Sequence, residues 1–243
     1  MENTLLVALS RQLAMTRQMS VIANNLANMN TAGYKAESAL FEEFMMPVAR
    51  EQSPDKTISF VQDFGLNRNL SGGRLETTDN PLDLAISGDG YFKVETQSGT
   101  QYTRDGHLQL DSQGRLVNSS GNPILTTSGS QLTFTTADGP ISIASDGTIS
   151  TDQGNRGKIG LVQFENPRLL QKTGNNLYQT EEPEQPVRNP AILQGALEMS
   201  NVQPIVEMTN MIEVLRSYSA AADMVEKADQ LERRAIAALG KGE

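Results

Sequence analysis

Both ends of the chain carry apolar residues spaced three and four positions apart. Near the start the pattern runs through Leu5, Ala8, Met15, Met19, Ile22, Leu26 and Met29, and Leu6, Leu9 and Leu13 widen it. Near the end it runs through Ile205, Met208, Met211, Ile212, Leu215, Tyr218, Ala222, Val225, Ile236 and Leu239. Residues at this spacing share one side of an α-helix. At 1.5 Å per residue, the pattern predicts helices of about 43 Å and about 52 Å.

The residues that break helices lie between these two segments. Glycine is absent from 1–32 and from 196–239, and proline occurs only from Pro47 to Pro204. Residues suited to a helix end or a turn follow the first helix, namely Asn28, Asn30 and Gly33. Pro204 suits the first turn of the second helix, with Ser200 or Asn201 as its N-cap.

The middle of the chain has the pattern of short strands separated by turns. Turn glycines recur mostly seven to ten residues apart, at Gly88, Gly106, Gly114, Gly121, Gly129, Gly139 and Gly147. Between them, the predicted strands are around Leu82–Ile86, Tyr91–Glu95, Gln101–Arg104, Leu116–Asn118, Leu132–Phe134, Ile141–Ile143 and Ile159–Phe164. This spacing predicts an antiparallel β domain without helices.

These patterns predict an α+β fold, in which a central antiparallel all-β domain is flanked by long terminal helices. We expect the helices to pack as a coiled-coil-like layer in an assembly. The predicted parts are a helical assembly domain (1–33 plus 200–243), a partly extended connecting region (34–80), the β domain (81–180) and a linker (181–199). Within the connection, Ala49–Asn69 reads as irregular, and whether it forms a hairpin against an adjacent subunit stays open.

The terminal helices need partners, because a helix with one apolar side is marginal alone. We expect them to pack on each other and on neighbouring copies, and to order on assembly; a helical hairpin against the sheet of a monomer is the alternative. Methionine side chains are flexible, which suits helix interfaces whose neighbours are not equivalent. The predicted interface residues are Leu5, Leu9, Met15, Met19, Ile22, Leu26, Met29, Met208, Met211, Ile212, Leu215, Tyr218, Ala222 and Val225.

Composition narrows the classes of function. The chain has no cysteine, no tryptophan and one histidine, which disfavours thiolate or imidazole metal sites and most histidine-based catalysis. We therefore predict no enzyme activity, no cofactor and no metal. A net charge of −9 is the wrong sign for nucleic-acid binding. No apolar run of membrane-spanning length exists, so we expect neither membrane insertion nor a cleaved signal peptide.

Several polar motifs have simple structural interpretations. Aspartates directly before glycines (Asp89, Asp105, Asp138 and Asp146) indicate turns rather than calcium loops. His107 is predicted to be a surface or edge-strand residue without ligand partners. The run Glu226, Asp229, Glu232, Arg233 and Arg234 is typical of a solvated helix face, although in a packed tube it could select neighbours or line a channel.

Four blocks of sequence resemble one protein family. Val21–Lys35 contains ANNLAN followed by a turn and Gly-Tyr-Lys, and Asn80–Val94 contains NPLD and GDGYF. Tyr102–Gly106 with Leu110–Val117, and Gln194–Val202 with Glu207–Glu213, complete the set. In this order the blocks are similar to those of bacterial flagellar rod and hook proteins. The signature positions are Asn24, Asn25, Asn28, Gly33, Tyr34, Lys35, Asn80, Pro81, Asp83, Gly88, Gly90, Ser200, Asn201 and Val202.

The resemblance implies a structural subunit of the basal-body rod in the periplasm. Such a subunit is exported by the flagellar type III apparatus and polymerises with copies of itself and with other rod proteins into a helical shaft that transmits torque. The short chain looks most like a proximal rod protein, with a distal rod protein as the near alternative. The asparagines of the first block would end the helix, or would make amide hydrogen bonds between subunits.

Two other classes of protein stay open at this point. One is a secreted β-domain binding module such as an adhesin, although no repeats are visible. The other is a carboxylate-dependent enzyme of the β-fold type, which would need a cleft with perturbed acids. Removal of the first helix separates these classes, because only a rod subunit should then lose assembly.

Overall fold

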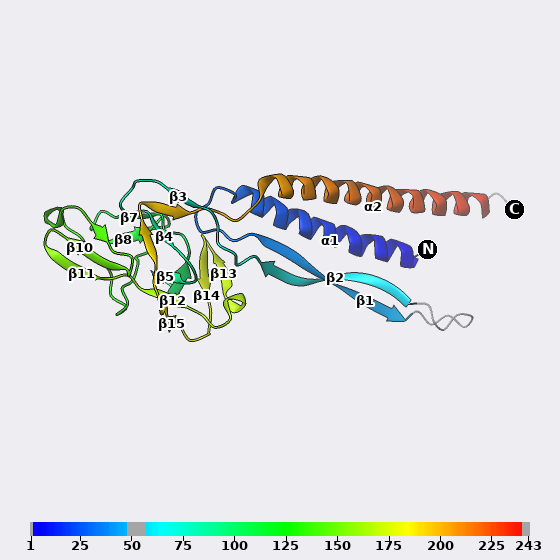
Figure 1. Ribbon diagram of the computed structural model, residues 1–243. Coiled ribbons are helices and arrows are strands. Elements are labelled where there is room, and N and C mark those ends of the chain that lie inside the picture. Colours follow the sequence, from blue (N-terminus) through cyan, green and yellow to red (C-terminus); the bar gives the residue numbers. More distant parts are fainter. Residues whose placement is uncertain (1, 48–56, 240–243) are drawn as a thin grey trace. The chain divides into compact units, whose positions relative to one another are not determined.

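The computed structural model of the chain describes residues 2–47 and 57–239 and divides into two units (Figure 1). The helical unit comprises Met1–Ala27, Glu37–Arg68 and Gln203–Glu243. The β unit comprises Asn28–Ala36 and Asn69–Val202. The α+β class with antiparallel sheets and two terminal helices is confirmed.

The helical unit contains two long helices and a β-hairpin. The helices, α1 (Glu2–Ala27) and α2 (Pro204–Leu239), run antiparallel along each other (Figure 1). Strands β1 (Glu37–Pro47) and β2 (Thr57–Arg68) pair antiparallel, and both contact α1. The register shifts between Leu40 and Phe41 at a β-bulge, where Gly65 pairs with Leu40 at a φ of 144°.

Two predictions about this unit need correction. The irregular structure expected for Ala49–Asn69 is wrong for Thr57–Arg68, because these residues form strand β2, and 49–56 lie outside the described residues. The apolar residues of this segment do not follow a helical spacing, so the segment reads as a loop in the sequence. Pro204 is indeed the first residue of α2, but Gln203 precedes it, so neither Ser200 nor Asn201 is the N-cap.

The β unit is built around a six-stranded antiparallel sheet in the order β13-β14-β6-β5-β12-β15. Its strands are β5 (Tyr91–Thr96), β6 (Gly99–Thr103), β12 (Leu161–Gln163), β13 (Gln171–Gly174), β14 (Leu177–Gln179) and β15 (Gln185–Pro186). A three-stranded sheet contains β9 (Ser142–Ile143), β10 (Thr148–Thr151) and β11 (Gly154–Lys158).

Three strand pairs complete this unit, and two of them join segments far apart in the sequence. Strand β4 (Leu84–Ile86) pairs with β16 (Ile192–Gln194), and β3 (Leu75–Thr77) pairs with β17 (Ala196–Glu198). The third pair is β7 (Leu108–Leu110) with β8 (Leu116–Asn118), and short 3-10 helices span Thr136–Asp138 and Pro167–Leu169.

The structure differs from two strand-level expectations. The linker expected at 181–199 contains β15, β16 and β17, which are two or three residues long and too short to show an alternating pattern. Conversely, Leu132–Phe134 is not a strand, since only isolated bridges form at Gln131 and Thr133. Leu132 and Phe134 are nevertheless buried in the core.

The core of the β unit is formed by residues from several of these strands and from the loops between them. Its buried side chains are Leu84, Ile86, Phe92, Val94, Leu108, Leu116, Ile124, Leu132, Phe134, Ile143, Ile149, Ile159, Leu161, Leu177 and Ile192. A second cluster is largely aromatic and contains Tyr91, Tyr102, Val162, Phe164, Leu170 and Tyr178. All of these residues belong to the β unit, so it has a hydrophobic core of its own.

Candidate assembly surface and signature cluster

One side of α2 is covered and follows a heptad pattern. Steps of four and three lead through seven of its partly or fully buried positions, Glu207, Met211, Val214, Tyr218, Ala221, Val225 and Ala228. Val214 and Ala221 are buried, although neither was among the predicted interface residues. We call these seven positions the α2 seam. The helix α2 packs on α1.

The other predicted apolar residues of α2 form a second row that is exposed. Ile205, Met208, Ile212 and Leu215, which we call the exposed stripe, keep 78%, 47%, 51% and 47% of their surface accessible. Met208, Ile212 and Leu215 each follow a seam position by one residue, which places them about 100° further around the helix. The set predicted as one interface on α2 therefore divides into a covered row and an uncovered one, with Ala222 half-buried.

Helix α1 is covered on a broader side because it contacts both α2 and the hairpin. Ile22 is buried, and Met15, Met19 and Leu26 are half-buried within the chain. Leu9 and Met29 are exposed, and Leu13 keeps 64% of its surface accessible. The side chain of Leu5 lies outside the described residues.

The signature asparagines of α1 differ in their surroundings. Asn25 is buried, and its side-chain amide donates to the carbonyl of Glu37 at 2.7 Å and accepts from the Glu37 N–H at 3.0 Å. Asn25 therefore joins α1 to the first residue of β1. Asn28 accepts hydrogen bonds from Thr31 in the turn after the helix, in keeping with a helix-ending role, whereas Asn24 is exposed.

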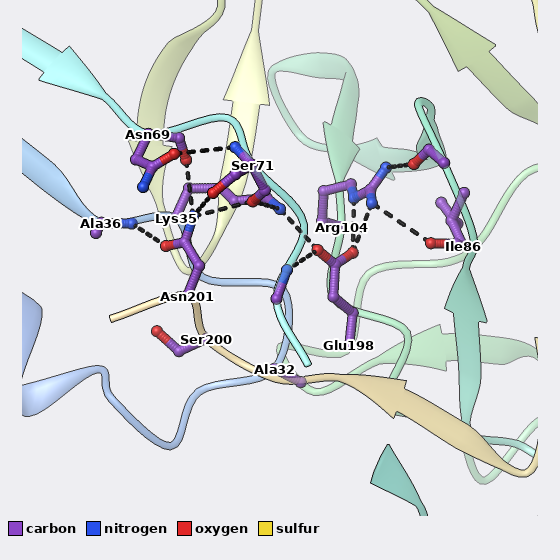
Figure 2. Close-up of polar contacts among 12 residues, drawn as sticks. Ala32, Lys35, Ala36, Asn69, Ser71, Ile86, Arg104, Glu198, Ser200 and Asn201 are labelled. Carbon is purple, nitrogen blue, oxygen red and sulfur yellow. Dashed lines mark hydrogen bonds and ion pairs between the residues drawn. The ribbon is translucent and has the colours of Figure 1, made fainter. Parts of the chain in front are cut away.

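A buried ion cluster in the β unit connects the four signature blocks (Figure 2). Glu198 of β17 accepts from the Lys35 ammonium group at 2.6 Å and from the Arg104 guanidinium at 2.6 Å. The Gly73 N–H donates to the same carboxylate at 2.9 Å. All three ionic side chains are buried, and we call them the signature cluster.

Arg104 extends this cluster to the loop before β5. Its guanidinium donates to the carbonyl oxygens of Gly88 at 2.8 Å and Gly90 at 2.7 Å. It also approaches the carbonyl of Ile86 at 3.4 Å (Figure 2). Gly88 and Gly90 have φ values of 101° and 143°, which glycine adopts without strain. The two signature glycines thus present their carbonyl groups to Arg104.

Gly33 and Tyr34 are held beside the same cluster. The Gly33 N–H donates to the Glu198 carbonyl at 2.7 Å, and a Cβ atom at Gly33 would collide with the backbone of Arg104. Tyr34 is buried, with the Lys172 ammonium group 4.2 Å from the centre of its ring. Only glycine fits at position 33, because the backbone of Arg104 lies where a side chain would begin.

The pKa values of Glu198 and Lys35 in the cluster are both lowered. Burial opposes the charge of Glu198, but Arg104, Lys35 and the Gly73 N–H outweigh it and hold the pKa of Glu198 below its usual value. Burial also lowers the pKa of Lys35, and the hydrogen bond and charge of Glu198 offset this only in part. Glu198 is therefore ionised at neutral pH.

Asn201 holds together the segments of the β unit that lead into the helical unit. Its side-chain oxygen accepts from the Ala36 N–H at 2.7 Å, and its amide donates to the carbonyls of Asn69 and Ser71 at 3.0 Å each (Figure 2). Ala36, Asn69 and Val202 are boundary residues of the β unit, at three of the points where the chain passes between the two units. Next to Asn201, the Ser200 hydroxyl accepts from the Val202 N–H.

The NPLD block forms a separate polar site with the single histidine. Asn80 donates to the carboxylate of buried Asp83 at 3.1 Å, and the His107 Nδ1 lies 2.9 Å from the same oxygen. His107 is at the surface, as predicted, but it has this carboxylate as a partner. Pro81 is exposed in the turn before Asp83.

The remaining polar motifs of the sequence are structural. Asp146 accepts from Thr148 in the turn at Gly147, but Asp138 is buried and pairs with Arg156. On α2, the exposed Arg233 pairs with Asp229 at 2.8 Å, which agrees with a solvated face; the side chain of Glu232 lies outside the described residues. Within the described residues, no group of acids and histidine is placed to hold a metal ion.

Sequence reasoning singled out Lys35 but missed its partners. Glu198 and Arg104 both lie inside recognised blocks, in QGALEMSN and YTRDG. For Arg104 the available signal was a charged residue at the end of a predicted strand, which usually needs a buried partner of opposite charge. Glu198 carried no such signal, because its strand was not predicted.

The fold and its two sites define a class of protein. In the β unit, the charged groups of the signature cluster bind one another and backbone carbonyl groups. Such contacts hold together segments that are far apart in the sequence. In the helical unit, a long helix leaves large apolar side chains uncovered. No described helix is long and apolar enough to cross a membrane. These features are those of a structural protein that presents a helical surface.

Comparison with known proteins identifies the family. Models of a flagellar basal-body rod protein (5–35), of the flagellar hook protein FlgE/F/G D1 domain (85–156) and of the flagellar basal body rod FlgEFG C-terminal region (193–238) match the chain. The chain is 39% identical over 243 residues to the flagellar basal-body rod protein FlgF of Caulobacter vibrioides, with 99% of both chains covered.

Other relatives agree with this result. The chain is 33% identical to FlgF of Mesorhizobium japonicum, again with 99% of both chains covered, and 33% identical to FlgG of Bacillus subtilis, with 88% of this chain and 90% of that protein covered. The chain belongs to the family of flagellar basal-body rod proteins, which are structural proteins of the rod. The alternative of an adhesin has no support among these relatives.

Proposed function

We propose that this chain is a subunit of the flagellar basal-body rod that assembles with copies of itself and with other rod proteins through α1 and α2. The observation that carries this proposal is the exposed stripe of α2. Four large apolar side chains in a single row are a surface that water does not favour and that a neighbouring chain would cover. The seam on the adjacent side of α2 already follows a heptad pattern. A neighbouring chain that covers the stripe would therefore extend this packing into a coiled-coil-like layer.

The proximal part of the rod is the position that the comparisons favour. The FlgF relatives are aligned over 99% of this chain and the FlgG relatives over 88%. A distal rod subunit is the second candidate. In either position the subunit would lie in the periplasmic rod, would reach it through the type III export apparatus and would transmit torque by its packing, without a cofactor.

The proposal is tested by placing charge on the exposed stripe. A chain with Ile212→Asp and Leu215→Asp should fold with unchanged helix content, because both side chains are exposed. It should nevertheless be absent from isolated basal bodies, and cells that carry it as their sole copy should not swim. The matched control is Thr209→Asp, which adds a charge at another exposed position of the same helix. Normal motility of the double variant would contradict the proposal.

A further inference from the structure

The α2 helix has a second apolar surface, on the other side of its seam. Ala220 and Met224 each precede a seam position by one residue, which places them about 100° around the helix from the seam, on the side away from the exposed stripe. The small polar residue Ser217 lies on the same side. Met224 keeps 62% of its surface accessible. The helix therefore presents two different apolar flanks, one in its first half and one further along.

This second flank forms a groove with α1. A cavity of about 250 Å³ is lined on α1 by Val7, Ala8 and Arg11 and on α2 by Ser217, Ala220, Ala221, Met224, Val225 and Ala228. Most of these side chains are small, so the groove has room for larger ones. The exposed stripe supplies such side chains, namely one leucine, two isoleucines and a methionine.

The charges of the two surfaces have opposite signs. Arg11 is the one charged side chain among the described residues that line the groove. The segment Pro204–Arg216, which carries the exposed stripe, contains two acids, Glu207 and Glu213, and one basic residue, Arg216, so its net charge is negative. Glu207 precedes Met208 and Glu213 follows Ile212, so an acid stands about 100° to either side of the stripe. None of Arg11, Glu207 and Glu213 makes an ion pair with the described residues.

We propose that the groove of one subunit, at Ala220 and Arg11, receives the exposed stripe of a second copy of this chain. This inference rests on the proposed function and specifies its contact. Ala220 also lines a shallow hollow with Ile212 and Leu215, but the rest of the groove is formed by residues outside the stripe. Each copy can therefore offer its stripe to one neighbour and its groove to another. Such a head-to-tail contact continues from copy to copy instead of closing into a symmetric pair.

Disulfide cross-linking tests this contact directly, since the natural chain contains no cysteine. A chain with Ile212→Cys and Ala220→Cys should give dimers, trimers and longer products when assembled basal bodies are oxidised. The two positions are eight residues apart, or about 12 Å along the helix, so they cannot pair within one chain. Chains with only one of the two cysteines should stay monomeric, and a mixture of the two single variants should stop at dimers.

The controls separate this contact from other modes of packing. A chain with Val206→Cys in place of Ile212→Cys should give no ladder, because exposed Val206 lies at least about 100° around the helix from each residue of the stripe. Efficient dimers from the Ile212→Cys chain alone would show that stripes meet each other and would overturn the inference. So would the absence of cross-links in a double variant that is present in basal bodies and supports swimming. Absence of the unmodified chain from the rod would instead refute the proposed function.

Charge reversal adds an independent test. Arg11→Glu should lower the yield of cross-linked product several-fold, and so should Glu207→Lys combined with Glu213→Lys. Joining all three changes restores opposite signs and should restore the yield. If the combined variant is no better than either parent, the groove does not face the acidic segment and the inference fails.

Discussion

At the scale of single residues, the β unit depends on charges that are buried and paired. Glu198 is the only acid hydrogen-bonded to both Lys35 and Arg104 in the described chain, so its loss leaves two buried cations without a counter-charge. The blocks that identify the family in sequence meet at this carboxylate. The blocks are thus parts of one structural site, although they are far apart along the chain.

Replacement of Glu198 should therefore destabilise the β unit strongly. Glu198→Gln keeps the shape of the side chain but removes its charge, and we expect a loss of about 3–5 kcal/mol in the free energy of unfolding. Urea denaturation followed by circular dichroism measures this loss. The matched control is Glu165→Gln, an exposed glutamate on the cavity that Glu198 also lines, which should change stability by less than about 0.5 kcal/mol. Equal effects of the two changes would contradict a role for the buried charge.

Asp146 should make the stability of the β unit depend on pH in the acid range. Hydrogen bonds from the backbone and hydroxyl of Thr148, with Lys158 nearby, lower the pKa of Asp146 to about 2. Because the folded pKa lies below the unfolded one, the stabilisation is present above the unfolded value of about 3.9 and is lost as the pH falls toward 2. Thermal melts of the wild-type chain and of Asp146→Asn should therefore converge between pH 4 and 2. A constant difference over that range would contradict this assignment.

At the scale of elements, the buried amide of Asn25 joins α1 to the first residue of the hairpin. Asn25→Ala leaves the N–H and carbonyl of Glu37 without the Asn25 amide, and we expect a loss of about 1–3 kcal/mol in stability. The same change at exposed Asn24 is the control, since it has the same effect on helix propensity. Hydrogen exchange at the Glu37 amide should accelerate only in Asn25→Ala. Acceleration in both variants would show that the helix end, and not the amide contact, protects Glu37.

Local sequence patterns predicted some of these elements and missed others, for physical reasons. The two helices were predictable because glycine and proline are absent from them and the apolar spacing is long. Strands β16 and β17 were missed because each has three residues and its partner lies about a hundred positions earlier in the sequence. The two rows of α2 were merged because residues one position apart, such as Met211 and Ile212, are equally apolar. Only packing on α1 distinguishes them.

At the scale of the whole molecule, the two units have separable roles. Every residue of the main β core lies in the β unit, so its folding does not require α1. Deletion of residues 1–27 should leave a cooperative thermal transition for the β unit and should abolish both incorporation into basal bodies and swimming. A truncated chain that still enters the rod would show that assembly depends on the β unit instead.

The central claim is that the exposed stripe of α2 is covered by a neighbouring chain in the rod. A density map of the isolated basal body at side-chain resolution tests it most directly. We predict that Ile205, Met208, Ile212 and Leu215 are buried against an adjacent subunit and that its α1 and α2 form the opposing surface. A map in which these four side chains face solvent, while subunits touch only through their β units, would contradict the account.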